Sequence, residues 1–185
     1  LDNKLKEMKA SDTSKDDMET YVNNWPTLNA KRYVVPNSFD FKVETVGVFN
    51  NETLIAKACI EVIKKVEKFK EAAQLDADVV TISDDEQTVP NCFTITLKNE
   101  DYTLGNLLQY VLYNRYYDEG NKKNKNAELT YCGFQKPHPH VTTSYIRLGF
   151  KDKVESAHVI EMLITTCSFI TKVFEDIQSH FVNDL

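Results

Sequence analysis

Three residues of the types that bind zinc, Cys132, His138 and His140, lie close together in the sequence. A thiolate and two imidazoles are suitable ligands, and the two histidines would share one face of a strand. A structural zinc site needs four ligands, however, and no second Cys/His pair lies nearby. Pro137 and Pro139 offer a plainer explanation, because prolines hold a segment extended and cannot donate to a ladder, which leaves the histidines at a sheet edge. We therefore expect no metal and no cofactor.

The adjacent carboxylates Glu100 and Asp101 are the other candidates for chemistry. They precede Thr103, where helical spacing begins, and acids at this position more often cap a helix and interact with its dipole. No second carboxylate cluster completes a two-metal site. Cys92 and Cys132 lack the neighbouring base that a nucleophile needs, and the common phosphate-loop, nucleophile-elbow and zinc-protease motifs are absent. The sequence thus predicts no catalytic residue.

The composition indicates an acidic protein with enough apolar residues for a core. Of the 185 residues, 42% are hydrophobic. The chain has 22 Lys and Arg residues and 28 Asp and Glu residues, which gives a net charge of -6. Direct nucleic-acid binding needs clustered cations, so it is not expected, and the lysines at 122–125 are interpreted as solvated. Four well-separated cysteines indicate buried thiols in a reducing intracellular compartment. No apolar run approaches the ~20 residues of a membrane span. From the start at Leu1 instead of Met, we expect a fragment, a processed product or the ordered part of something longer.

The first half of the chain divides into four segments. Residues 1–36 form a polar lead-in, in which Trp25 is expected to dock on the body of the protein. Residues 39–49 alternate apolar and polar, which predicts a half-buried strand. After Asn50, apolar residues recur at helical spacing for about six turns. Residues 76–91 are acidic and predict a linker that contains at most one short strand.

The second half repeats the order of strand and helix and ends in a long helix. The predicted elements are strand 92–98, helix 103–117, polar loop 118–128, strands 129–135 and 143–150, and helix 155–182. The apolar stripe of the last helix is ~40 Å long. A sheet of three short strands cannot cover it, so part should meet another surface. Strands and helices mix without regular βαβ alternation, which favours an α+β fold.

Several motifs occur in a fixed order: an acidic pair, a helix start containing TLGN, a glycine followed by an aromatic residue, PHP, and an arginine in a strand. The residues are Glu100, Asp101, Thr103, Gly105, Asn106, Gly133, Pro137, His138, Pro139 and Arg147. Together they resemble the small alpha-like subunits of multisubunit RNA polymerases, the archaeal L subunit and the eleventh subunit of polymerase II. Tyr102 departs from the pattern, because the family usually has histidine there. Gly105 costs ~1 kcal/mol relative to alanine inside a helix, which either a close helix or a first-turn position would explain.

A second, shorter motif lies upstream. Residues 39–47 resemble the last part of the larger alpha-like subunit, the archaeal D subunit or the third subunit of polymerase II. The resemblance implies two fused halves, an arrangement known from polymerases of large DNA viruses: 37–75 is D-like, 76–91 a linker and 92–185 L-like. It implies an α+β fold of two units, each with a small antiparallel sheet packed on long amphipathic helices.

The function implied by this resemblance is that of a non-catalytic platform for polymerase assembly. The implied partners are the two largest polymerase subunits and small zinc-binding subunits, with nucleic acid met only through the complex and no membrane. A viral protein of this kind would occupy the cytoplasmic replication site and the virion. The predicted interface sets Leu104, Leu107, Leu108, Val111 and Leu112 against Phe41, Val43, Ile55, Cys59, Val62 and Ile63.

Two other hypotheses remain open from the residues alone. One is a stand-alone protein–protein adaptor with a ferredoxin-like fold, which would not copurify with polymerase subunits. The other is a small metal-dependent enzyme that uses Cys132, His138 and His140, and it would retain stoichiometric metal after dialysis. On the platform hypothesis, Leu108→Asp is expected to abolish assembly while the helices and strands persist.

Overall fold

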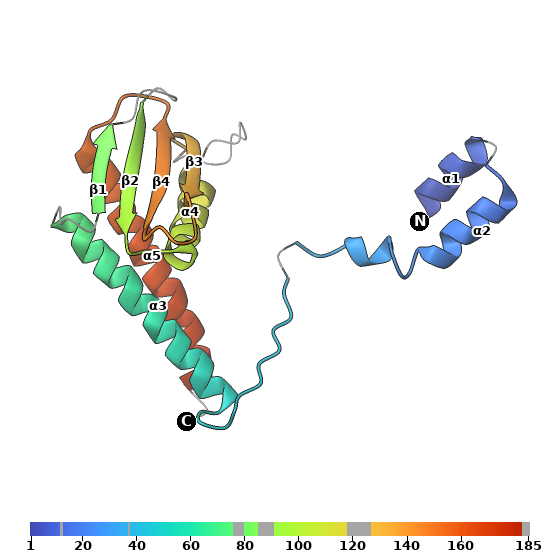
Figure 1. The fold of residues 1–185 in the computed structure, drawn as a ribbon, viewed down its shortest axis with the longest axis horizontal. Coiled ribbons are helices and arrows are strands. Elements are labelled where there is room, and N and C mark those ends of the chain that lie inside the picture. Colours follow the sequence, from blue (N-terminus) through green and yellow to red (C-terminus); the bar gives the residue numbers. More distant parts are fainter. Residues whose placement is uncertain (12, 37, 76–79, 85–90, 118–126, 183–185) are drawn as a thin grey trace. The chain divides into compact units, whose positions relative to one another are not determined.

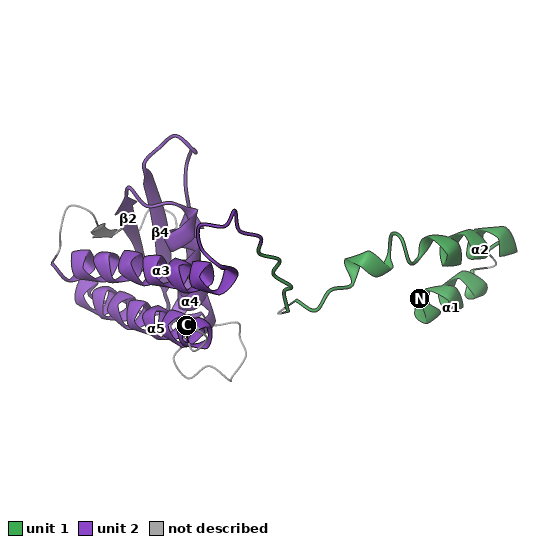
Figure 2. Ribbon diagram, turned by 90° about the horizontal axis from the view of Figure 1, so that it is seen from below, with its two compact units in different colours: residues 1–43 green, residues 44–185 purple. Residues whose placement is uncertain are grey.

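The chain divides into two compact units, Leu1–Val43 and Glu44–Leu185, which we describe one at a time (Figures 1 and 2). The computed structural model describes residues 1–11, 13–36, 38–75, 80–84, 91–117 and 127–182. The predicted loop 118–128 therefore lies almost wholly outside the described residues, as does much of the predicted linker 76–91.

The first unit contains helices α1 (Asp2–Ala10) and α2 (Lys15–Asn24) and a short 3₁₀ helix, η1 (Ala30–Arg32). The hydroxyl of Ser14 caps α2 by accepting a hydrogen bond from the Asp17 amide at 3.1 Å. Trp25 lies between the rings of Tyr21 and Tyr33, with centroid distances of 5.7 and 5.6 Å. No residue of α1 or α2 is buried. The lead-in therefore has an aromatic cluster but no core.

The prediction of a strand over 39–49 is wrong for this structure. The segment runs without strand pairing, and Phe39 and Phe41 are 73% and 86% exposed. A strand requires a neighbour whose backbone groups complete the ladder, and no described residue supplies one. The described residues of 37–75, the segment predicted to be D-like, accordingly form no sheet of their own, contrary to the prediction of one sheet in each half.

The second unit begins with α3 (Asn51–Gln74), whose first turn is capped by the Asn50 side chain, which accepts from the Thr53 amide at 2.7 Å. The remaining elements are β1 (Val80–Asp84), β2 (Cys92–Lys98), α4 (Tyr102–Tyr116), β3 (Leu129–Gln135), β4 (Thr143–Phe150) and α5 (Ser156–Val182). The α+β class and the bounds predicted for the last three strands are confirmed.

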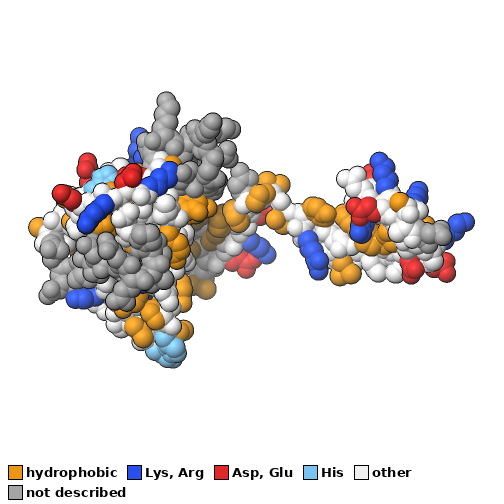
Figure 3. Space-filling model, turned by 90° about the horizontal axis from the view of Figure 1, so that it is seen from above, with side chains coloured by type: hydrophobic (Ala, Val, Ile, Leu, Met, Phe, Trp, Pro, Cys, Tyr) orange, Lys and Arg blue, Asp and Glu red, His pale blue; other side chains and the backbone are white. Residues whose placement is uncertain are grey.

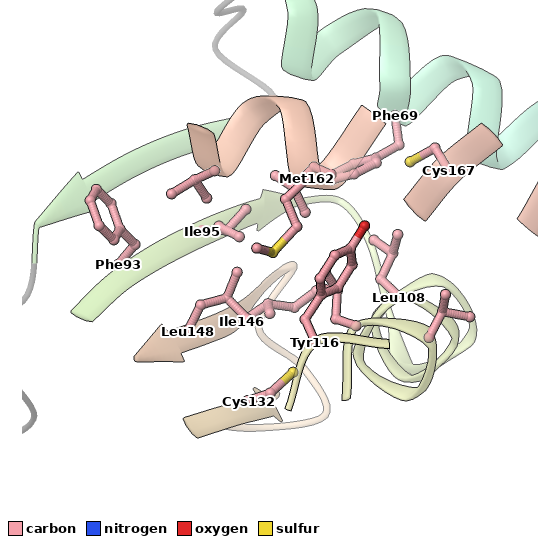
Figure 4. Close-up of a cluster of buried hydrophobic side chains, with 14 of the residues drawn as sticks. Phe69, Phe93, Ile95, Leu108, Tyr116, Cys132, Ile146, Leu148, Met162 and Cys167 are labelled. Atoms are coloured by element: carbon pink, nitrogen blue, oxygen red, sulfur yellow. The ribbon is translucent and has the colours of Figure 1, made fainter. Parts of the chain in front are cut away.

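All four strands pair antiparallel in the order β1-β2-β4-β3. Figures 1 and 2 show α3 and α5 side by side, and Figure 1 shows α4 and α5 on one face of the sheet. On that face Ile95, Ile146 and Leu148 of the sheet belong to one core with Leu108 of α4 and Met162 of α5 (Figure 4). The core is thus a single layer between the sheet and its helices.

Helix α5 carries the broad apolar stripe that the sequence predicts. By length and composition alone it would pass as a membrane span, a test that core helices also pass. In the structure Val159, Leu163 and Ile170 are buried in the core. The second surface that the stripe was expected to meet is α3, which packs along it.

Candidate functional site

The acidic pair lies at the start of α4, and Asp101 caps that helix. Its Oδ1 accepts a hydrogen bond from the Thr103 amide at 3.0 Å. This backbone hydrogen bond is the main cause that lowers the pKa of the Asp101 carboxyl, and the charges of Lys65 and Lys136 add to it. The predicted capping role is therefore confirmed for Asp101.

Glu100 connects α4 to two other elements. Its Oε2 lies 3.0 Å from Nζ of Lys65 on α3, which is also 3.9 Å from Asp101 Oδ1. The Glu100 carbonyl accepts a hydrogen bond from Oγ of the buried Ser144 on β4 at 3.0 Å. The motif thus joins α3, α4 and the sheet at one corner.

Gly105 is required by the close approach of a side chain from β3. A Cβ atom at this position would overlap the ring of Phe134. That ring is held edge-on to Tyr102, with centroids 5.7 Å apart. Both explanations considered for Gly105 involved helix geometry, whereas the neighbour is an aromatic side chain of the sheet. The glycine lets α4 lie directly on Phe134.

The residues considered for zinc do not assemble into a site. His138 and His140 are exposed, and Nδ1 of His138 accepts a hydrogen bond from the His140 amide at 3.2 Å. Cys132 is buried, its thiol donates to the Gln109 carbonyl at 3.7 Å, and burial raises its pKa to about 12. Burial therefore disfavours the thiolate, which is the form of cysteine that binds zinc. Within the described ranges, no group of three His, Cys, Asp or Glu side chains is placed to hold a metal ion.

Arg147 projects from β4 on the face of the sheet away from the helices. Its Nε donates to Oγ1 of Thr94 at 3.4 Å, across the β2–β4 pair. With Tyr131 and Tyr145 it lines a hollow of about 220 Å³. Gly133 keeps this hollow open, because a side chain there would meet the Tyr131 hydroxyl.

Within the second unit, the predicted interface residues of α3 and of α4 lie on two helices that do not pack mainly on each other. On α4, Leu104, Leu108, Val111 and Leu112 are buried in the core of the second unit, and Leu107 is partly buried against it. From the first half, Cys59 is buried; Val43, Ile55, Val62 and Ile63 are half-buried; and Phe41 is exposed.

The reason is that α3 packs along α5, whereas α4 packs mainly on β3, with further contacts to α5 and β4. The broad stripe of α5 offers α3 a larger apolar surface than the narrow one of α4. Sequence spacing identifies an apolar stripe on a helix, but it does not identify the surface that packs against that stripe. Contact of these residues with a second subunit stays a prediction.

Sequence reasoning missed Lys65 and Glu67 on α3. The hydroxyl of Thr171 on α5 donates to Oε1 of Glu67 at 2.7 Å. This hydrogen bond is the largest cause that lowers the pKa of Glu67. Charged residues on an amphipathic helix are usually solvated, so nothing in the local pattern separates these two from the other charges of α3.

Part of the chain is similar to a known family of proteins. The model of the RNA polymerase Rpb3/Rpb11 dimerisation domain family matches residues 92–180, from β2 to near the end of α5. No curated protein matches the sequence significantly. The family match supports an alpha-like subunit that acts in RNA polymerase assembly and transcription, with other polymerase subunits as its partners.

Proposed function

We propose that the chain is a non-catalytic assembly platform of a DNA-dependent RNA polymerase, in which two alpha-like halves are fused. The observation that carries the proposal is the packing of α3, which precedes the matched residues 92–180, along α5 of the matched domain. Helix α3 would be the contribution of the larger half. Such a fusion resembles the fused subunit of the African swine fever virus RNA polymerase, and it would place the chain in viral transcription.

The contact between α3 and the matched domain has the character of a permanent interface. Cys59, Val66, Phe69 and Ala73 of α3 are buried, and Val66 and Phe69 belong to the same core cluster as Leu108. Permanent interfaces resemble a protein core cut in half. Fusion of the two halves would hold them at an effective concentration of roughly mM, so that their pairing would not depend on two chains meeting.

Exposed apolar residues support contacts with further subunits. On α5, Phe169, Val173 and Ile177 are exposed, and the guanidinium of Arg115 lies 4.7 Å from the Phe169 ring centroid. Figure 3 shows hydrophobic side chains at the surface of the second unit among polar ones. The proposed partners are the two largest polymerase subunits and the small zinc-binding subunits, with nucleic acid met only through the complex.

The test is affinity purification of the tagged full chain from its native or infected cell, followed by mass spectrometry and an RNA-synthesis assay. We expect the two largest polymerase subunits and RNA-synthesising activity in the purified material. Recovery of the chain without any polymerase subunit would refute the proposal and favour the adaptor hypothesis.

A matched pair of variants locates the surface. Val173→Lys places a lysine in the exposed stripe of α5, whereas Glu175→Lys places a lysine at a nearby exposed position and makes an even larger change in charge, two units instead of one. We expect Val173→Lys to lower recovery of the large subunits about tenfold, because the interface would have to desolvate the ammonium. Glu175→Lys should leave recovery near the wild-type level.

A further inference from the structure

We propose that three consecutive residues of α3, Lys65, Val66 and Glu67, fix the register in which α3 docks on the rest of the second unit. The inference deepens the proposed function, because it names the residues that would set the pairing of the two alpha-like halves. Val66 is the apolar anchor of the triplet, and the two charged neighbours reach different helices: Lys65 reaches the start of α4, and Glu67 reaches α5.

Apolar packing alone leaves the register open. Val66 is fully buried in the core, but the stripe of α3 repeats every three or four residues. A slide by one turn, about 5.4 Å, would bring Val62, Ile63 or Phe69 to the place of Val66. Degenerate apolar stripes of this kind obtain a unique alignment from polar contacts, as single polar residues do in coiled coils.

The contact with Glu100 requires a cation. The Glu100 side chain is only 13% exposed and that of Lys65 35% exposed, and Nζ lies 3.0 Å from Oε2. Oε2 is buried and has no hydrogen-bond partner among the described residues, so the ammonium of Lys65 is the charge that stabilises it. A carboxylate oxygen shielded from water is costly without such a partner.

The contact with Thr171 uses Glu67 as its hydrogen-bond acceptor. The Thr171 hydroxyl donates to Oε1 at 2.7 Å, while Oε2 lies 3.2 Å from Nζ of Lys70 in the next turn. The carboxylate is thus held between a donor on α5 and a cation on its own helix. The lowered pKa of Glu67, caused first by the Thr171 hydrogen bond, agrees with this arrangement.

No other register reproduces both contacts, a cation at Glu100 and a carboxylate at Thr171. Slides of three or four residues in either direction would bring one of four other residues to each of the two positions. The place of Lys65 would be taken by Glu61, Val62, Lys68 or Phe69, and that of Glu67 by Ile63, Lys64, Lys70 or Glu71 respectively. Only the slide that brings Lys68 to Glu100 retains a cation there, and it sets Lys70 against Thr171.

The register is measurable in the purified full chain as a distance between spin labels on α3 and α5. Glu71→Cys and Ser179→Cys provide exposed labelling sites, and the four native cysteines are buried. In this labelled background we expect a single distance from double electron–electron resonance. The variant Lys65→Met/Glu67→Leu should add a population displaced by about 5 Å, one helical turn. The control Lys64→Met/Lys68→Met alters two more exposed lysines of α3 and should retain the single distance.

A single variant makes the expectation sharper. Glu67→Leu alone leaves Glu100 in need of a cation. Its new population should therefore correspond to the three-residue slide that brings Lys68 to Glu100, a displacement of about 4.5 Å. This variant also serves if the double variant does not fold by circular dichroism. A single native distance in folded Glu67→Leu and folded Lys65→Met/Glu67→Leu would overturn the inference. Because no other subunit is present, the result is independent of copurification with polymerase.

Discussion

In this fold, the substitution Gly105→Ala should change the stability in the direction opposite to its usual one. Alanine in place of glycine inside a helix normally stabilises it by up to ~1 kcal/mol. Here the added methyl group would overlap the Phe134 ring, which lies half-buried against α4 and edge-on to Tyr102. We therefore expect Gly105→Ala to destabilise the second unit.

The magnitude follows from two opposed effects. Overpacking costs about 1–3 kcal/mol, and the helix gains less than ~1 kcal/mol because Gly105 lies near the start of α4. The half-buried ring can shift in part, so we place the net loss at about 1 kcal/mol. In a Phe134→Ala background the obstacle is gone, and Gly105→Ala should then stabilise by a few tenths to ~1 kcal/mol.

The assay is urea denaturation of the full chain followed by far-UV circular dichroism, with the free energy of unfolding compared in both backgrounds. Asn106→Ala, at an exposed position on the same helix, is the control and should have a similar small effect in both. The reasoning is refuted if Gly105→Ala stabilises the chain equally with and without the Phe134 ring.

Three further predictions concern the core, the thiols and the contact between α3 and α5. Leu108 is fully buried, so Leu108→Asp should cost more than about 3 kcal/mol and unfold the second unit, instead of sparing its helices and strands; a native circular dichroism spectrum would contradict this. Burial raises the pKa values of Cys132 and Cys167 to about 12, so at pH 8 iodoacetamide should modify both in urea but neither in the folded chain, as read by mass spectrometry. The Thr171 hydrogen bond lowers the pKa of Glu67, so its stabilisation is present above the unfolded pKa and is lost as the pH falls through the folded pKa. Thr171→Val should therefore cost more at pH 7 than at pH 3, by less than about 1 kcal/mol because the Glu67 side chain is 38% exposed; equal costs in thermal unfolding at the two pH values would contradict it.

The second unit could be predicted closely because its elements are locally determined. Alternating apolar and polar residues indicate strands 92–98, 129–135 and 143–150, and apolar residues at helical spacing indicate α5. The periodicity of apolar residues alone therefore predicts the bounds of these elements. The same alternation over 39–49 predicts a strand that does not form. Period identifies which side chains share a face, but a strand also needs a neighbour for its backbone groups.

The candidate site was predictable only where it depends on neighbours in sequence. The cap by Asp101 follows from its place before Thr103. The ion pair between Lys65 and Glu100 joins distant segments, and its formation depends on how α3 docks. The buried leucines of α4 illustrate the same limit, because a stripe covered by its own chain and one covered by a partner have the same spacing.

The most direct test of the platform is an assembly measurement with defined components. The two largest polymerase subunits would be coexpressed with the small subunits, with and without the full chain, and the tagged largest subunit would be isolated. The account predicts a stoichiometric complex with RNA-synthesising activity only when the chain is present. Assembly of the two largest subunits into an active enzyme in its absence would contradict the account.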